Sequence, residues 1–355
     1  MKTLSEFRAK HDPLTIIARL EQELREANDQ LGLESTIKDL LGTTVLRLDR
    51  ISPPAWVANE PKKSDAPGVP TLFLSDFHWG EVVQSGQVGG VNRYSLDIAR
   101  KRLRHTVNTA ANLLRILDPK MQYPGIVVPL GGDMVSGNIH EELQATNEVN
   151  IMPAVLDLFE SLAGAIGLLA GVFGKVFLPC VSGNHGRDTR KTWAKDRNHT
   201  SFDWVLYQFL ARHFAADKRV TFHIPEGSDA LYRIYGTRYL LTHGDQFKSG
   251  DSIIGPIGPL MRGNQKKTAR NQAVGQEYDV MLAGHWHQYI HLSRMIVNGS
   301  LKGYDEYAAA NNFGFEPPTQ ALWITHPRFG ITYRMPVYCE TPDKRANAEW
   351  ISVQK

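Results

Sequence analysis

The stretch VFLPCVSGNHGRD, residues 176–188, joins a short apolar run to a turn of unusual composition. The apolar run is typical of a strand inside a sheet that is covered on both faces. Glycine, asparagine, histidine and a second glycine follow almost directly. Alone, these residues indicate a plain turn, because Asn and Gly are common turn residues. Their meaning therefore depends on which residues come after the other strands of the chain.

Similar apolar runs recur from residue 71 onward. Several of them are separated by segments whose apolar residues have the spacing of an α-helix. We expect buried strands at 71–75, 125–130, 175–181, 239–243 and 279–284. We expect helices at about 95–117, with Ser95 as the N-cap, at 152–173 and at 201–214. Strands that alternate with helices are typical of an α/β domain.

Each of the five predicted strands is followed by side chains that can bind a metal ion. These are Asp76 and His78, then Asp133, then Asn184 and His185, then His243, and finally His285 and His287. Each cluster alone has an ordinary explanation, such as a strand-end turn, a helix cap or a hydrogen-bonded structural histidine. The carboxyl ends of strands in open α/β sheets, however, are where ligands bind. The joint occurrence of the five clusters predicts a metal site at this edge.

The donor types in these clusters favour divalent cations. Carboxylate, imidazole and amide oxygen suit Mn²⁺, Fe²⁺ or Zn²⁺. Cys180 and Cys339 lie in apolar runs outside the clusters, which argues against a structural zinc site. A carboxylate can bridge two ions, and such a pair activates water and clamps phosphoryl oxygens. We therefore expect two divalent metal ions, Mn²⁺ first, with Fe²⁺, Zn²⁺, Mg²⁺ and Ni²⁺ as alternatives.

The series D-x-H, G-D, G-N-H, H and G-H-x-H, over residues 71–300, closely resembles the calcineurin-like metallophosphoesterase superfamily. The resemblance implies a four-layer αββα sandwich of two mixed β-sheets with a dinuclear centre on their edge. The ligands that it implies are Asp76, His78 and His287 for the first ion, Asp133 as the bridge, and Asn184, His243 and His285 for the second ion. It also implies hydrolysis of a phosphoester by a hydroxide held between the two ions.

His185 has a different role in this resemblance. Its counterparts contact the phosphate and help protonate the leaving oxygen, so His185 is the expected catalytic acid. Many relatives place an acidic residue next, where this chain has Gly186. Asp188, Asp245, Asp133 or a water molecule are the alternatives for orienting the imidazole.

The motifs do not specify the substrate, but basic segments near them favour a polyanion. The loop 186–199 contributes Arg187, Arg190 and Trp193, and the segment 246–276, expected to be a long loop, contributes Arg262, Lys266 and Lys267. Cations that grip a phosphate backbone and an aromatic ring that stacks on a base are typical of nucleic-acid binding. We expect a phosphodiesterase or nuclease acting on DNA or RNA, similar to the DNA-repair and phage-like nucleases of the superfamily.

Two other functions stay open at this point. A phosphomonoesterase or nucleotide hydrolase would use the same metal ligands, with the basic segments gripping a small polyphosphate. A non-catalytic scaffold can also share this fold, although the complete ligand set and His185 argue against it.

The rest of the chain predicts the domain organisation. Apolar residues at helical spacing from Leu14 to Leu31 predict an amphipathic helix within residues 1–50, which either packs on its own domain or forms a homodimer. Proline-rich residues 51–70 predict a linker, followed by a catalytic domain over 71–340 and a tail over 341–355.

Composition is that of a globular protein. The chain has 355 residues, of which 42 % are hydrophobic, and its net charge of +3 is too small to indicate nucleic-acid binding by itself. We find no apolar run of about 18 residues and no secretory signal, so we expect no membrane association and a cytoplasmic location.

Overall fold

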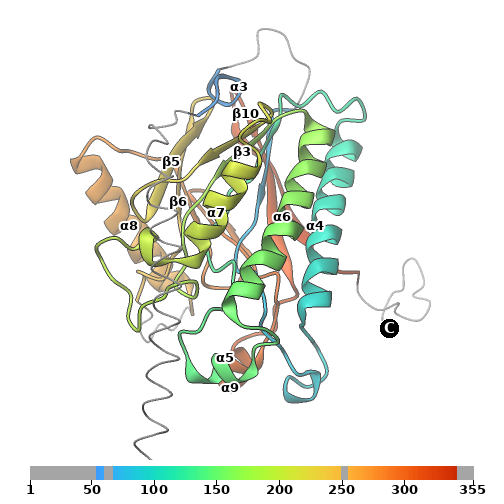
Figure 1. The fold of residues 1–355 in the computed structure, drawn as a ribbon. Helices are drawn as coiled ribbons and strands as arrows, with labels where there is room; N and C mark the ends of the chain where they lie inside the picture. Colours follow the sequence, from blue (N-terminus) through green and yellow to red (C-terminus); the bar gives the residue numbers. More distant parts are fainter. Residues whose placement is uncertain (1–52, 60–66, 249–254, 342–355) are drawn as a thin grey trace, which may run out of the picture. The chain divides into compact units, whose positions relative to one another are not determined.

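The computed structural model describes residues 53–59, 67–248 and 255–341 (Figure 1). By its internal contacts the chain divides into two compact units, residues 1–50 and residues 51–355. The helices and the dimer predicted for residues 1–50 lie outside the described residues, as does nearly all of the predicted tail.

Two mixed β-sheets form the framework of the second unit. The first has the order β11 (Gly330–Tyr338), β10 (Thr319–His326), β1 (Val69–Phe73), β2 (Ile126–Val127), β3 (Val176–Pro179), β4 (Val220–His223). The second has the order β5 (Asp229–Ile234), β6 (Thr237–Thr242), β7 (Val280–Ala283), β9 (Met295–Val297), β8 (Ile290–Leu292). Strands β1 to β4 run parallel, as do β6, β7 and β9. All five predicted strands are therefore present.

Three apolar cores hold the layers together. The outer face of the first sheet packs against α4 (Leu96–Leu117), α6 (Ile151–Phe173) and α7 (Phe202–His213). The inner faces of both sheets meet through residues such as Phe73, Phe177 and Tyr239. Leu260 of α8 (Ile257–Ala273) packs against Leu240 and Met281 of the second sheet. The predicted four-layer αββα sandwich is confirmed (Figure 1).

Local signals explain where the long helices begin and end. The side chain of Ser95 accepts a hydrogen bond from Ile98 N at 3.4 Å, so the predicted N-cap of α4 is confirmed. Helix α6 ends at Gly174, whose φ of 73° lies in the left-handed region that glycine adopts without strain.

The segment 246–276 was expected to be a loop, and this expectation is wrong for most of it. Residues 257–273 form α8. Glycines and prolines at its start suggested a loop, but Leu260 and Gly263 are buried against the sheet, and this packing outweighs the weak local preference. A Cβ at Gly263 would lie 2.3 Å from Cδ1 of Phe247, which shows how closely the helix approaches its neighbours.

The predicted linker over 51–70 also contains folded structure. Residues 55–58 form the short helix α3 (Ala55–Ala58). Val57 is fully buried in the core between the sheets, and its carbonyl accepts a hydrogen bond from Tyr235 N at 2.8 Å. Trp56 also packs against this core, so the helix belongs to the folded domain although prolines flank it in the sequence.

By length and composition alone, α6 could cross a membrane, contrary to the expectation that no such segment exists. The longest apolar run in the sequence, residues 162–178, is interrupted by Lys175, whereas the helix begins at Ile151 and ends before that lysine. Core helices of soluble proteins have the same composition. One face of α6, including Leu158, Leu162 and Ile166, is buried in the first apolar core.

Candidate metal centre

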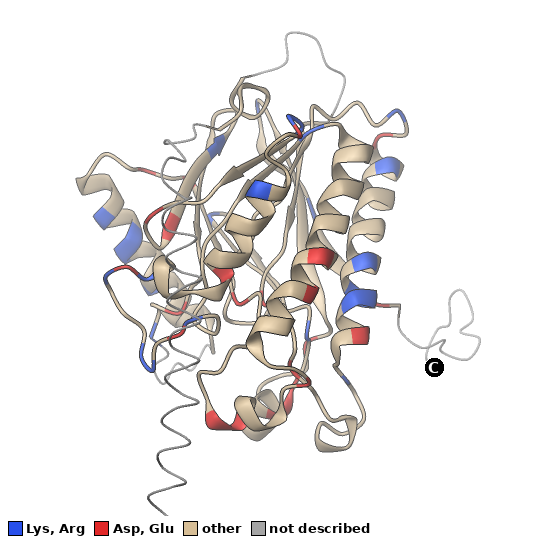
Figure 2. Ribbon diagram, viewed as in Figure 1, with Lys and Arg blue, Asp and Glu red and all other residues tan. Residues whose placement is uncertain are grey.

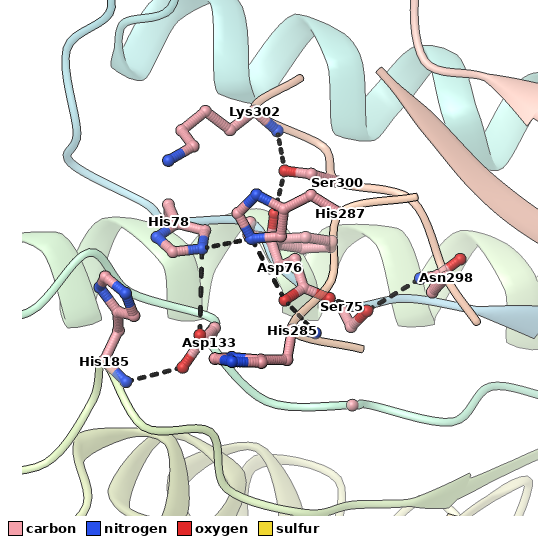
Figure 3. A network of polar contacts seen from close by, with 12 residues as sticks. Ser75, Asp76, His78, Asp133, His185, His285, His287, Asn298, Ser300 and Lys302 are labelled. Carbon is pink, nitrogen blue, oxygen red and sulfur yellow. Dashed lines mark hydrogen bonds and ion pairs between the residues drawn. The ribbon is translucent and has the colours of Figure 1, made fainter. Parts of the chain in front are cut away.

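Loops after β1, β2, β3, β6 and β7 bring the predicted ligands to one edge of the two sheets. Three clusters form there, each with donor atoms within 4.8 Å of one another: Asp76, His78 and His287; His78, Asp133 and His185; Asp133, His243 and His285. Asn184 Oδ1 lies 3.2 Å from His243 Nε2. The structure therefore brings all seven predicted ligands and His185 together, and Figure 3 shows Asp133 between His185 and His78.

Five of these residues have an uncommon backbone conformation. The φ angles are 55° for Asp76, 49° for His78, 50° for Asp133, 68° for His285 and 52° for His287. Positive φ is rare outside glycine, and such strain clusters at functional sites, where the surrounding structure fixes it. Here the loops fix one another, because Asp76 N donates to Gly132 O and His78 N to Asp133 O, both at 3.0 Å.

The first half of the site consists of Asp76, His78 and His287. Asp76 is fully buried, and its Oδ1 lies 3.5 Å from His287 Nε2 and accepts a hydrogen bond from His285 N at 2.8 Å. The Nε2 atoms of His78 and His287 lie 3.1 Å apart. The imidazoles of His78 and His287 and the carboxylate of Asp76 thus face one small space.

Asp133 connects this half to the second. Its Oδ2 lies 3.0 Å from His243 Nε2 and 4.0 Å from His78 Nε2. His243 is oriented from behind, because its Nδ1 donates a hydrogen bond to Gly131 O at 2.8 Å. Its Nε2 therefore faces Asp133 and Asn184.

Electrostatics at the site match the chemistry of metal ligands. Burial lowers the pKa of His78 to about 3 and that of His285 to about 4, so both imidazoles are neutral and can donate lone pairs. Burial would raise the pKa of Asp133, but His243 outweighs it and the carboxyl stays ionised. For His243, burial is outweighed by Asp133, which raises its pKa to about 10. Ionised carboxylates and the neutral imidazoles of His78 and His285 fit divalent cations, whereas His243 would lose its proton when an ion binds.

The structure shows what orients His185. Its Nδ1 donates a hydrogen bond to Ser136 O at 2.9 Å, and its backbone N donates to Asp133 Oδ1 at 2.7 Å. The ring packs edge-on against His78, with centroids 4.4 Å apart. With Nδ1 engaged, Nε2 is the ring nitrogen left to exchange a proton. A backbone carbonyl, which was not among the alternatives weighed from the sequence, therefore orients the imidazole.

Asp203 is a functional residue that the sequence did not single out. This fully buried carboxylate from α7 accepts hydrogen bonds from Asp133 N at 3.0 Å, Gly183 N at 2.9 Å and Met134 N at 3.2 Å. Burial raises its pKa to about 6. It also explains Gly186, because a Cβ at that position would lie 2.8 Å from Asp203 Oδ1. In the sequence it is an acid in the first turn of a helix, which is common and gives no signal.

Glu81, Lys302 and Asp305 form a second buried group that sequence reasoning missed. Glu81 Oε2 lies 3.2 Å from His78 Nδ1, and Glu81 Oε1 accepts a hydrogen bond from Lys302 Nζ at 2.8 Å. Lys302 Nζ also lies 2.5 Å from Asp305 Oδ2. Burial opposes the charge on Glu81, but Lys302 outweighs it and lowers the pKa of Glu81. The only sequence signal is that Glu81 lies three residues after His78.

The six residues predicted to bind substrate differ in their surroundings. Arg190, Arg262 and Lys266 are exposed, and Trp193 is 55 % exposed. Arg187 donates instead to backbone carbonyls of its own loop, including Asn184 O at 2.6 Å. The position of Lys267 does not fit the prediction that this residue binds substrate. Its side chain is buried and donates to Asp229 at 2.7 and 2.9 Å, because it lies on the face of α8 that packs against the sheet.

No protein-family model and no curated protein matches this chain. Solved structures with a similar fold include a conserved uncharacterised protein from Streptococcus pneumoniae, described as a predicted phosphoesterase. It is 11 % identical, with 72 % of this chain and 82 % of that chain covered and a TM-score of 0.27. Vacuolar Protein Sorting 29 from Cryptosporidium parvum is 13 % identical, with 72 % and 84 % covered and a TM-score of 0.29.

A Zn²⁺ complex of the Entamoeba histolytica Vacuolar Protein Sorting 29 is also similar, at 13 % identity, with 47 % of this chain and 84 % of that chain covered and a TM-score of 0.24. At these identities and TM-scores the matches carry no argument about activity. The chain resembles the metallophosphoesterase superfamily in motif order and in fold class.

Proposed function

We propose that this chain is a phosphoester hydrolase of the calcineurin-like metallophosphoesterase superfamily, dependent on two divalent ions. The observation that carries the proposal is the convergence of the three ligand clusters at one sheet edge, with His185 beside Asp133. The ligands would be Asp76, His78 and His287 for one ion, Asn184, His243 and His285 for the other, and Asp133 for both. When bound, the ions supply positive charge that stabilises phosphoryl oxygens and activates water at neutral pH.

The protein's own residues account for the rest of the chemistry. Asp203 and the paired loops fix the position of Asp133, so the site is preorganised before substrate arrives. His185, held by Ser136 O through Nδ1, presents Nε2 to the leaving group and donates a proton to the departing oxygen.

For the substrate, we propose the phosphodiester bond of a nucleic acid. Supporting side chains are Arg190, Trp193, Arg262 and Lys266, which are exposed on the loop after β3 and on α8. Figure 2 shows that α8 and the loop 186–199 both carry Lys and Arg on one side of the domain in that view. Basic side chains would contact the phosphates, and the indole would stack on a base.

The second candidate is a phosphomonoesterase or nucleotide hydrolase. Several cations near the site are already paired, which favours a small substrate. Arg197 donates two hydrogen bonds to Asp245, both at 2.9 Å, and Asp229 binds both Lys267 and Arg270. These cations add little net charge for a long polyanion.

Substrate preference distinguishes the two candidates. The full-length protein, loaded with Mn²⁺, is incubated with bis-p-nitrophenyl phosphate, p-nitrophenyl phosphate, and labelled single- and double-stranded oligonucleotides. Cleavage of the diester and of an oligonucleotide is expected. Hydrolysis of the monoester alone would overturn the nuclease proposal and favour the second candidate. No hydrolysis of any of them, with two ions bound, would favour a non-catalytic protein.

Charge reversal on α8 tests the nucleic-acid surface directly. Arg262→Glu with Lys266→Glu should weaken oligonucleotide binding and reduce the slope of log K against log salt by about one for each phosphate that the variant no longer neutralises. The matched control is Arg115→Glu with Lys120→Glu, two exposed cations at the end of α4 and just beyond it. Equal salt slopes for the wild type and the α8 variant would show that α8 does not contact the phosphates.

A further inference from the structure

The imidazoles of the site differ in what lies behind them. His243 and His185 each donate from Nδ1 to a backbone carbonyl, Gly131 O at 2.8 Å and Ser136 O at 2.9 Å. His78 instead has a side-chain carboxylate behind it, because its Nδ1 lies 3.2 Å from Glu81 Oε2. A carboxylate behind a ligating histidine fixes the tautomer and raises the basicity of the coordinating nitrogen more than a neutral carbonyl does.

Glu81 is held rigidly. Lys302 Nζ donates to Glu81 Oε1 at 2.8 Å, and all three members of the group are buried, with exposed fractions of 7 % for Glu81, 3 % for Lys302 and 6 % for Asp305. The same segment fixes a metal ligand, because Ser300 Oγ donates to Asp76 O at 2.8 Å and Leu301 N donates to it at 3.2 Å. One stretch after β9 therefore positions Asp76 through Ser300 (Figure 3) and reaches His78 through Lys302 and Glu81.

The charge behind the two halves of the site is unequal. Glu81 and Asp305 are two carboxylates around one ammonium, which leaves one negative charge behind His78. On the side of His243 and His285, two carboxylates face two guanidinium groups. Asp245 is neutralised by Arg197 through two hydrogen bonds, and the charge of Asp203 is offset in number by that of Arg187, which donates to Asn184 O at 2.6 Å. A cation entering the first half is attracted by this excess charge, which burial shields from solvent.

We propose that Glu81, anchored by Lys302, is the positioning residue of the half formed by Asp76, His78 and His287, and that it makes this half bind its divalent ion before the other. Glu81 Oε2, 3.2 Å from His78 Nδ1, electrostatically favours the tautomer with the proton on Nδ1, so that Nε2 faces the ion. This inference rests on the proposed function, which requires two ions.

Mn²⁺ titration of the metal-free, full-length protein by calorimetry tests the order of binding. Two steps are expected for the wild type. In Glu81→Gln, the tighter step should weaken about 10- to 100-fold, while the weaker step is unchanged. The matched control is Glu306→Gln, a half-buried residue in the neighbouring helix α9 (Glu306–Ala310). Its carboxylate accepts from Gln84 N at 2.6 Å and is not part of the buried group. Both of its steps should match the wild type.

A spectroscopic measurement separates positioning from mere stability. Long-range ¹H–¹⁵N NMR of the metal-free wild type should show the His78 proton on Nδ1, and Glu81→Gln should populate the other tautomer. A variant that is only less stable would lower the melting temperature without changing the tautomer. If Glu81→Gln fails to fold, the triple variant Glu81→Gln, Lys302→Met and Asp305→Asn removes every charge of the buried group and should show the same weakened step.

The outcomes distinguish the two proposals. A wild type that binds no Mn²⁺ would overturn the proposed function. A wild type that binds two ions, with both steps unchanged in Glu81→Gln, would overturn the role of Glu81 alone.

Discussion

Asp133 faces partners on both sides, since Oδ1 accepts a hydrogen bond from His185 N and Oδ2 lies 3.0 Å from His243 Nε2. A ligand shared by two ions cannot be replaced by a neutral amide without loss to both. Asp133→Asn should therefore reduce bound Mn²⁺ and hydrolysis together, as measured by elemental analysis and by diester turnover. Asp217→Asn, at an exposed carboxylate paired with Arg219, is the control and should retain both. Two ions per chain in Asp133→Asn would contradict the bridging role.

His185 contributes chemistry without a ligand role in this proposal. His185→Ala should keep the wild-type metal content and lose about 10²- to 10⁴-fold in turnover on alkyl esters. The loss should be much smaller on nitrophenyl esters, because a good leaving group needs no proton. Turnover of both substrate types, with metal content measured in parallel, checks this. An equal loss on both would argue against the acid role of His185.

At the scale of single elements, α8 carries neighbouring lysines with different surroundings. Lys266 is exposed, whereas the neighbouring Lys267 is buried against Asp229. Lys267→Met should lower the free energy of unfolding by about 1–3 kcal/mol, because the largely buried carboxylate of Asp229 loses one of its two charged partners and keeps Arg270. Urea denaturation measures this, and Lys266→Met should stay within about 0.5 kcal/mol of the wild type.

The ion pair of Lys267 with Asp229 also predicts how the free energy of unfolding depends on pH. Burial would raise the pKa of Asp229, but Lys267 and Arg270 outweigh it and hold the pKa below its ordinary value. A lowered carboxyl pKa stabilises the fold above the unfolded value of about 3.9, and this stabilisation is lost as pH falls through the folded value. The difference in unfolding free energy between wild type and Lys267→Met should therefore shrink below about pH 4. A difference that stays constant from pH 7 to pH 3 would mean that the pair does not account for the effect.

At the scale of the whole molecule, all ligands of the proposed centre lie within residues 51–355, the second compact unit. The truncated protein of residues 51–355 should therefore bind the same number of Mn²⁺ ions and hydrolyse the same diester as the full chain. Light scattering after size-exclusion chromatography compares their masses. A dimer that becomes a monomer on truncation would support dimerisation through residues 1–50. Loss of metal binding would show that these residues complete the site.

Local signals made much of the fold predictable. Apolar runs, turn residues and the N-cap Ser95 all act within a few residues, so the five strands and three long helices could be placed from the sequence. Local signals gave the wrong prediction at α8. There, glycine and proline favoured a loop, but burial against the second sheet outweighed this preference.

The sequence by itself determined which predicted metal ligands come after which strands, because each motif is a short run that directly follows a strand. Only the tertiary structure decided what supports them. Glu81 and Lys302 are 221 residues apart, and Asp203 reaches across 70 residues to Asp133. A Ser136 carbonyl, not an acidic side chain, orients His185. Such contacts depend on how two sheets and their helices pack, which no local pattern encodes.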